Sequence, residues 1–188
     1  MMRNTLLAAA AALLPLAACA EGGDAYQDMR ETAAKMPPKL LGVMQDEIAK
    51  GGPVGAISTC RDKAPAMAKS LSEATGMQIR RVSLKNRNPK AAPDAWEREM
   101  LEEFDRRAAA GENPATLEAA ATVVEDGKPV RRYMKALPTQ ELCLMCHGTS
   151  DTIGQDVAGK LKELYPDDKA VGYHAKEVRG AITVKKPL

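Results

Sequence analysis

Two cysteines and a histidine lie close together near residue 145, in the order Cys143, Cys146, His147. Residues three apart on a helical turn face the same way, so both thiols can add to the two vinyl groups of one porphyrin. The histidine that follows directly can then place an imidazole nitrogen beneath the iron. The pattern Cys-x-x-Cys-His therefore predicts one covalently bound haem c.

Two other uses of this motif fit the sequence less well. A structural zinc site would need two further cysteines or histidines at short spacing, and the sequence has none there. A thioredoxin-like dithiol would need an α/β context and would have no use for His147. Haem attachment remains the interpretation that accounts for all three residues.

The ligand on the opposite side of the iron is left open by spacing alone. The candidates are Cys60, His174, a methionine, or no residue at all. Arg61 and Lys63 flank Cys60 and would favour its thiolate, although a cysteine there could equally be a small buried residue or form an intermolecular disulfide. His174 lies in a polar loop, as a surface residue would. Most of the 10 methionines are expected to fill the core.

Basic residues between positions 80 and 87 are candidates for binding the haem propionates. Arg81, Lys85 and Arg87 belong to a dense cluster that begins at Arg80. Guanidinium groups pair well with carboxylates, whereas a solvated basic loop would leave them without a ligand. Trp96 is expected to lie in the core.

The N-terminus predicts export and a lipid anchor. Arg3 precedes an apolar run over residues 6–18, which is too short to cross a membrane and ends in Leu-Ala-Ala before Cys19. This resembles the lipobox of bacterial lipoproteins, so we expect a signal peptide over residues 1–18, lipidation of Cys19, a tether over residues 19–24 and a location on the periplasmic side of a membrane. The alternative is an ordinary signal cut near Ala20, which leaves a soluble periplasmic protein.

Residues 25–188 predict a single α+β domain. Hydrophobic residues make up 45% of the chain and charged residues 28%, and a net charge of +2 is too small to favour nucleic acid. The order of elements predicts a small antiparallel sheet covered by helices. The predicted helices are 25–50, divided at Pro37-Pro38; 54–74, interrupted at Pro65; 93–110; a short one carrying the haem motif and capped by Thr139; and 156–164. The predicted strands lie around 79–84, over 119–124 and 130–137 with Asp126-Gly127 as the hairpin turn, and over 178–184.

Several stretches together resemble a family of exported single-haem c-type domains, long catalogued as a domain of unknown function. They are 56–65, 80–89, 93–97, Tyr133, 143–148 and 165–181. The resemblance implies a PAS-like antiparallel sheet with helices, and an iron held between His147 and Cys60. The family's domain occurs alone or as the sensor module of membrane histidine kinases and chemoreceptors. Since no such module follows Leu188 here, we expect a signal to pass to a separate partner.

The implied ligand pair gives an expectation for function. A thiolate opposite His147 stabilises ferric over ferrous iron, and its departure on reduction would open a site for a small gas. We therefore expect a redox or gas sensor. The alternative is a low-potential electron carrier that serves a redox partner protein and keeps both ligands. An enzyme is not expected, since no general base or second cofactor site is visible.

Overall fold

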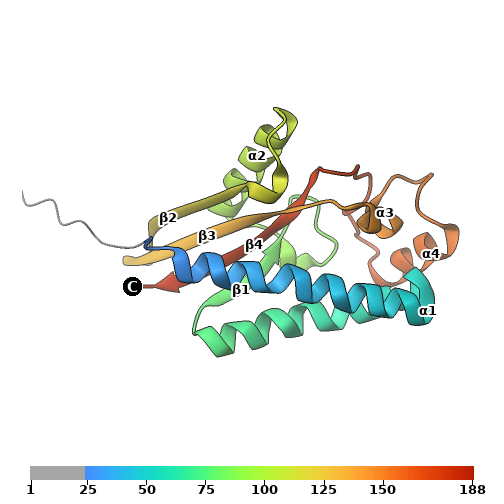
Figure 1. Ribbon diagram of the computed structural model, residues 1–188, viewed down its shortest axis with the longest axis horizontal. Coiled ribbons are helices and arrows are strands. Elements are labelled where there is room, and N and C mark those ends of the chain that lie inside the picture. The colour runs from blue at the N-terminus through green and yellow to red at the C-terminus, as the bar shows by residue number, and fades with distance from the viewer. Residues whose placement is uncertain (1–23) are drawn as a thin grey trace, which may run out of the picture.

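The structure is a computed structural model that describes residues 24–188, so the predicted signal peptide over residues 1–18, the predicted lipidation site Cys19 and all of the predicted tether except Asp24 lie outside the described residues. Within them, four antiparallel strands form one sheet in the order β1-β4-β3-β2. The strands are β1 (Gln78–Val82), β2 (Glu118–Glu125), β3 (Lys128–Pro138) and β4 (Val178–Pro187). The α+β class is confirmed, and the arrangement is consistent with a PAS-like fold (Figure 1).

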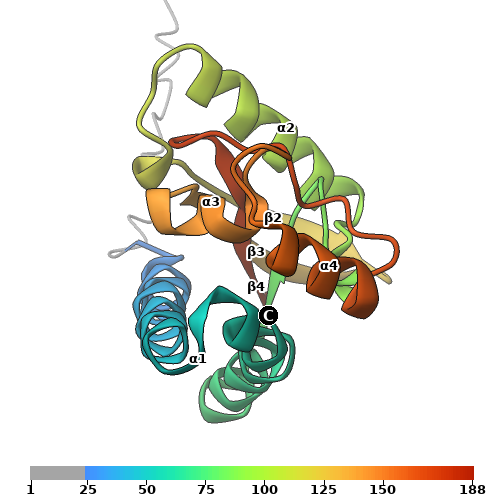
Figure 2. The same ribbon diagram turned by 90° about the vertical axis from the view of Figure 1, so that its right-hand side faces the viewer.

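A long helical hairpin begins the described chain. Helix α1 (Gln27–Thr75) folds back on itself at Gly52, whose φ of 67° and ψ of −178° are not helical. Gly52 has no Cβ to oppose the positive φ, and Pro53 supplies a fixed φ suited to the start of the returning helix. We call residues 27–51 the first arm and residues 53–75 the second arm. They run side by side in opposite directions (Figures 1 and 2).

The sheet has helices on both faces, as Figure 2 shows end-on. On one face, Met29, Ala33 and Met36 of the first arm pack with Ala68 of the second arm against the sheet. On the other face, α2 (Ala95–Ala109) contributes Leu101 and Phe104 to a second core. Because side chains alternate along a strand, β1 supplies both cores, Ile79 to the first and Val82 to the second.

Two short helices lie at the end of the sheet near the Gly52 turn. These are α3 (Glu141–His147) and α4 (Gln155–Leu164). Ile57 of the second arm packs against Val157 and Leu161 of α4, and Cys146 of α3 contacts the same cluster. This packing fixes the position of α3 relative to the second arm. Two 3₁₀ turns, η1 (Pro89–Ala91) and η2 (Pro114–Thr116), complete the connections.

Three local predictions are corrected by the structure. The breaks predicted at Pro37-Pro38 and at Pro65 are wrong, because α1 runs through all three prolines. Each proline removes one helical hydrogen bond, but the buried stripe that contains Met36 and Ala68 continues on both sides. Thr139 does not cap α3, because its backbone pairs with Glu177 and Lys176 in an extended conformation, and Gln140 is the N-cap instead.

The predicted hairpin turn is confirmed. Asp126 and Gly127 form the turn between β2 and β3, with φ of 50° and 75°, as a two-residue hairpin of type I′ requires. Asp94 is the N-cap of helix α2, and its carboxylate accepts from the Glu97 amide in a capping box. Among residues 24–188, no helix combines the length and the apolar character needed to cross a bilayer.

Candidate functional site

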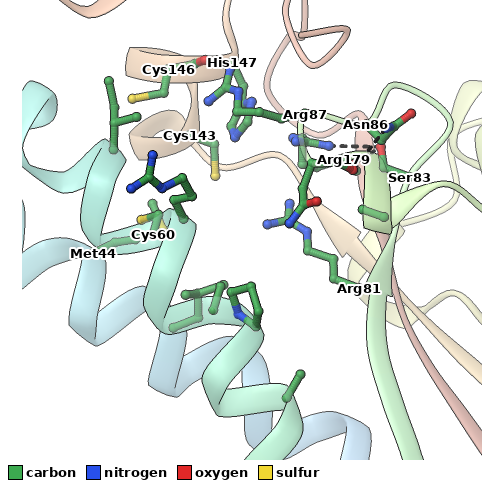
Figure 3. A pocket seen from close by; sticks show the side chains of 18 of the residues that line it. Met44, Cys60, Arg81, Ser83, Asn86, Arg87, Cys143, Cys146, His147 and Arg179 are labelled. Atoms are coloured by element: carbon green, nitrogen blue, oxygen red, sulfur yellow. Dashed lines mark hydrogen bonds between the residues drawn. The ribbon is translucent and has the colours of Figure 1, made fainter. Parts of the chain in front are cut away.

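A mostly apolar cavity of about 430 Å³ separates α1, α3 and the edge of the sheet. Its apolar wall comes mainly from both arms of α1, and its polar wall comes from β1, from the loop that follows β1 and from β4 (Figure 3). The structure brings the four residues predicted to attach haem or to bind its iron to this one cavity: Cys60, Cys143, Cys146 and His147. The apolar lining includes Met36, Leu40, Met44, Ile48, Ile57, Ala64, Ala68, Ile79 and Leu142.

Helix α3 presents the haem motif to the cavity. The two thiols occur one helical turn apart, and both line the space (Figure 3). Burial raises the pKa of the Cys146 thiol, and the Arg87 charge opposes that rise. Both cysteines are free in this structure, so their sulfurs are available for thioether bonds.

His147 is held in one tautomer. Its Nδ1 lies 2.7 Å from the carbonyl oxygen of Ala170, and because a carbonyl only accepts, Nδ1 carries the hydrogen and Nε2 keeps its lone pair. Burial, together with the charges of Arg179 and Arg87, holds the pKa of His147 well below its ordinary value. The neutral ring is therefore ready to coordinate a metal through Nε2.

The segment after α4 fixes the backbone of His147 as well. The Tyr173 amide donates to the His147 carbonyl oxygen at 2.9 Å, and the Gly172 amide donates to that of Gly148 at 2.7 Å. The Tyr173 ring meets the His147 imidazole edge to face, with centroids 6.4 Å apart. A hydrogen bond from the ring nitrogen, a hydrogen bond to the backbone carbonyl oxygen and the neighbouring Tyr173 ring therefore position the imidazole.

Cys60 comes from the opposite wall. It lies on the second arm, one turn after Ile57, and Figure 3 shows it beside the space that Cys143 enters from α3. Burial raises the pKa of the Cys60 thiol, while Arg81 and Arg87 oppose that rise. The flanking basic residues contribute less than the sequence suggested, since Lys63 is exposed and pairs with Glu47 at 3.1 Å.

The three residues predicted to bind propionates have different positions. Arg81 lines the cavity. Arg87 also lines it, but its guanidinium pairs with Asp168 at 2.8 Å and donates to the Cys146 carbonyl oxygen at 2.6 Å. Lys85 does not line this cavity; it is exposed, with its ammonium 4.8 Å from the centroid of the Tyr173 ring.

Sequence reasoning missed Arg179 as a site residue. Arg179 lines the cavity from β4, is 5% exposed, and donates from Nη1 to the Ser83 hydroxyl at 3.0 Å. The only signal in the sequence was the Arg-Gly pair at positions 179–180, inside a stretch that resembled the family. His174, the other candidate ligand, is exposed and does not line the cavity.

The residues present fit haem c. Two thiols on one helical turn face an apolar space, a neutral imidazole offers Nε2, and a third sulfur lies on the opposite wall. A bare metal ion fits less well, because within residues 24–188 no group of three or more His, Cys, Asp or Glu side chains is arranged to hold one. A donor set this sparse, inside an apolar cavity, suits a metal that brings its own equatorial ligands.

Comparisons with known proteins identify similar chains. A model of the Tll0287-like family matches residues 19–187 of the chain. The crystal structure of the cyanobacterial heme-protein Tll0287 is similar, with a TM-score of 0.64 and 26% sequence identity, over 85% of this chain and 92% of that chain. No curated protein sequence matches the chain.

Proposed function

Because the chain belongs to the Tll0287-like family, we propose that it is a haem-binding protein that acts as a redox or gas sensor. Cys143 and Cys146 attach one haem c, and His147 and Cys60 are the two iron ligands. The observation that supports this proposal best is that all four residues line a single apolar cavity. The solved relative, which is a heme-protein, supports the cofactor.

When bound, haem c supplies an iron that changes oxidation state reversibly and that can take a small gas where a protein ligand leaves. The two proposed ligands are held very differently. His147 is fixed through its ring nitrogen and its backbone carbonyl. The Cys60 sulfur makes no hydrogen bond to any residue within 24–188 and depends on its helix alone for position. Cys60 is therefore the ligand that can exchange.

A low-potential electron carrier is the second candidate. Ile57, one turn before Cys60, packs tightly against α4, and a rigid helix would hold the cysteine in place in both oxidation states. In that case a redox partner protein, and not a gas, would be the physiological partner. In both cases the protein is proposed to have no catalytic role.

Absorption spectra of the purified holoprotein test both proposals. We expect the haem to stay with the denatured chain through acid extraction, and the ferric form to be low-spin with a sulfur-to-iron charge-transfer band. Cys60→Ala should abolish that band and raise the reduction potential, because an anionic donor that favours ferric iron is removed. Met44→Leu, a volume-conserving change in the same cavity, is the matched control and should leave the spectrum unchanged. Haem that extracts freely would contradict the covalent site, and an unchanged Cys60→Ala spectrum would contradict the ligand.

Carbon monoxide separates the sensor from the carrier. A sensor should bind it slowly when reduced, limited by departure of Cys60, and Cys60→Ala should bind it quickly. A carrier should barely bind it in the wild type. Fast binding by the wild type would argue against Cys60 as a ferrous ligand.

We further propose that the protein is anchored to the periplasmic side of a membrane through lipidated Cys19 and signals to a separate partner. An anchored protein should partition with membranes, and Cys19→Ser should release it or block signal cleavage. A wild type found unmodified and soluble in the periplasm would exclude the anchor and leave the haem site unaffected.

A further inference from the structure

Four arginines line the sheet side of the cavity, and two of them have a carboxylate partner. The four are Arg80, Arg81, Arg87 and Arg179. Arg80 pairs with Glu97, and Arg87 pairs with Asp168. Arg81 and Arg179 form no ion pair with any carboxylate among residues 24–188. Guanidinium groups in partly or wholly buried positions are normally paired, because removing a charge from water without compensation is costly.

The backbone is specially shaped to aim Arg179 into the cavity. The β3–β4 register shifts between Leu137, opposite Gly180, and Pro138, opposite Val178, so that Arg179 is the extra residue of a β-bulge. On an uninterrupted strand, Val178 would lie on the face opposite Ala181. Because of the bulge, Val178 instead packs in the α2 core together with Ala181. Without the bulge, alternation would place Arg179 on the α2 face with Ala181. With it, the guanidinium is directed to the opposite face.

Gly180 makes this bulge possible. Its φ is 147°, and a Cβ there would overlap the carbonyl oxygen of Val82 on the neighbouring strand. Only glycine fits both constraints. A β-bulge that only glycine allows therefore directs a buried arginine into the cavity, where its charge is available to a ligand.

Arg81 reaches the same region by plain alternation. Its neighbour Arg80 points to the α2 face and pairs with the buried carboxylate of Glu97, while Arg81 points to the α1 face and into the cavity (Figure 3). The Arg81 guanidinium makes no hydrogen bond within residues 24–188. Burial lowers the pKa of Arg81, and burial with the charge of Arg81 lowers that of Arg179. The charge of Arg81 therefore makes the charged form of Arg179 less favourable, and an anion bound beside them would offset this repulsion.

The Arg179 side chain has unused donors. Its Nη1 donates to Ser83 and to the Lys85 carbonyl oxygen, and its guanidinium lies 5.1 Å from the centroid of the Tyr173 ring. Its buried Nε has no hydrogen-bond partner. These contacts orient the guanidinium but do not neutralise it, which leaves its charge for a ligand.

Resting on the proposed function, we propose that Arg81 and Arg179 are the residues that bind the two propionate carboxylates of the haem. Two monovalent cations without counter-ions are equal in number and opposite in charge to the two propionate carboxylates. A guanidinium can bind a carboxylate through two parallel hydrogen bonds. Arg87 is a positioning residue, because its guanidinium is already engaged by Asp168 and by the Cys146 carbonyl. Lys85 contributes only its backbone carbonyl oxygen, which accepts from Arg179, and its side chain does not line the cavity.

The test compares three variants with the same change of charge: Arg81→Gln, Arg179→Gln and Lys85→Gln, each as holoprotein. A cation close to a carboxylate lowers its pKa by roughly 1–3 units. Loss of Arg81 or Arg179 should therefore move the propionate-dependent step in the pH profile of the reduction potential upward by roughly that amount. The propionate bending bands in resonance Raman spectra should shift in the same two variants. Lys85→Gln should match the wild type in both measurements.

Arg87 with its partner Asp168, Tyr173 and the ligand His147 also face this part of the cavity, and none of them is altered in these variants. Arg81→Lys keeps the charge and should restore most of the wild-type profile. If Arg179→Gln yields no holoprotein because Ser83 loses its donor, Arg81→Gln decides the question, since Arg81 has no hydrogen bond of its own to lose.

Four results would overturn the proposal. Unchanged profiles and Raman bands in haem-loaded Arg81→Gln would exclude the propionate contact and leave the proposed function standing. Equal shifts in Lys85→Gln would show a general charge effect. A wild-type profile that responds to added inorganic phosphate, with the response lost in Arg81→Gln, would assign the arginines to a diffusible anion. A wild type without covalent haem would end this proposal and the proposed function together.

Discussion

Replacing Arg87 with alanine tests how the loop after β1 is tied to the haem motif. The Arg87 guanidinium pairs with Asp168 at 2.8 Å and donates to the carbonyl oxygens of Cys146 at 2.6 Å and Ala170 at 3.3 Å. Ala170 is also the residue whose carbonyl oxygen orients His147. One side chain therefore connects three separate segments of the site.

The expected loss follows from burial. The Arg87 and Asp168 side chains are 12% and 11% exposed, and breaking a buried pair by removing one partner lowers stability by roughly 3–5 kcal/mol. Because solvent still reaches both groups, we expect about 3 kcal/mol for Arg87→Ala, roughly a hundredfold in the unfolding equilibrium. The matched control is Arg106→Ala, whose pair with Glu103 is 65% and 42% exposed and is expected to contribute only about 0.3–0.5 kcal/mol.

Urea denaturation of the two holoprotein variants at constant ionic strength measures both free energies of unfolding. Arg87→Lys should fall between Arg87→Ala and the wild type, because an ammonium keeps the charge but cannot make the three contacts in one plane. A loss below about 1 kcal/mol for Arg87→Ala, comparable to that of an exposed pair, would refute the reasoning that this arginine holds the site together.

Two further predictions concern the sheet and the start of α2. Gly180→Ala should lower the free energy of unfolding by at least about 2 kcal/mol, because the residue has positive φ and its Cβ would overlap the Val82 carbonyl oxygen. The control, Gly159→Ala on an open face of α4, should instead raise the free energy of unfolding by roughly 0.5–1 kcal/mol. Equal effects of the two substitutions in urea denaturation would contradict this reasoning. Burial alone would raise the pKa of Asp94, but hydrogen bonds from Arg132 and the Glu97 amide outweigh it and lower the pKa to about 2. Because the folded pKa is depressed, the stability from Asp94 should be complete above pH ~4 and disappear as the pH falls toward 2, about 1 kcal/mol after allowance for its partial exposure. Asp94→Asn should remove this part of the acid dependence, and an unchanged pH profile of stability would contradict it.

That Cys143, Cys146 and His147 lie side by side was predictable because it depends on local geometry. Cys143, Cys146 and His147 share one turn of one helix, so their spacing alone places them together. The position of Cys60 is a long-range result: it depends on the reversal of α1 at Gly52 and on packing of the second arm against α4. The resemblance to a family supplied that partner, since no periodic pattern in the sequence could.

Arg179 shows where pattern reasoning fails. Strict alternation along β4 would have assigned it to the α2 face, and the bulge that redirects it depends on contact between Gly180 and β1, about a hundred residues earlier. Lys85 was predicted to bind a propionate because it lies near Arg81 and Arg87 in the sequence. Its side chain does not line the cavity and lies over the Tyr173 ring instead. Clustering along the chain is a poor guide where a strand ends and a loop begins.

The two walls of the cavity come from parts of the chain that are far apart, and this has a consequence for the mechanics of the fold. Cys60 and Cys143 are 83 positions apart in the sequence. Under the proposed ligation, the prosthetic group acts as a cross-link that closes this loop, much as a disulfide would. On the chain-entropy account, a loop of that length contributes about 4–5 kcal/mol to stability. Release of the sulfur on reduction would then open the cross-link and allow the helical hairpin to move against the sheet. A one-electron reduction of the iron would in this way change how strongly the two parts of the fold are held together.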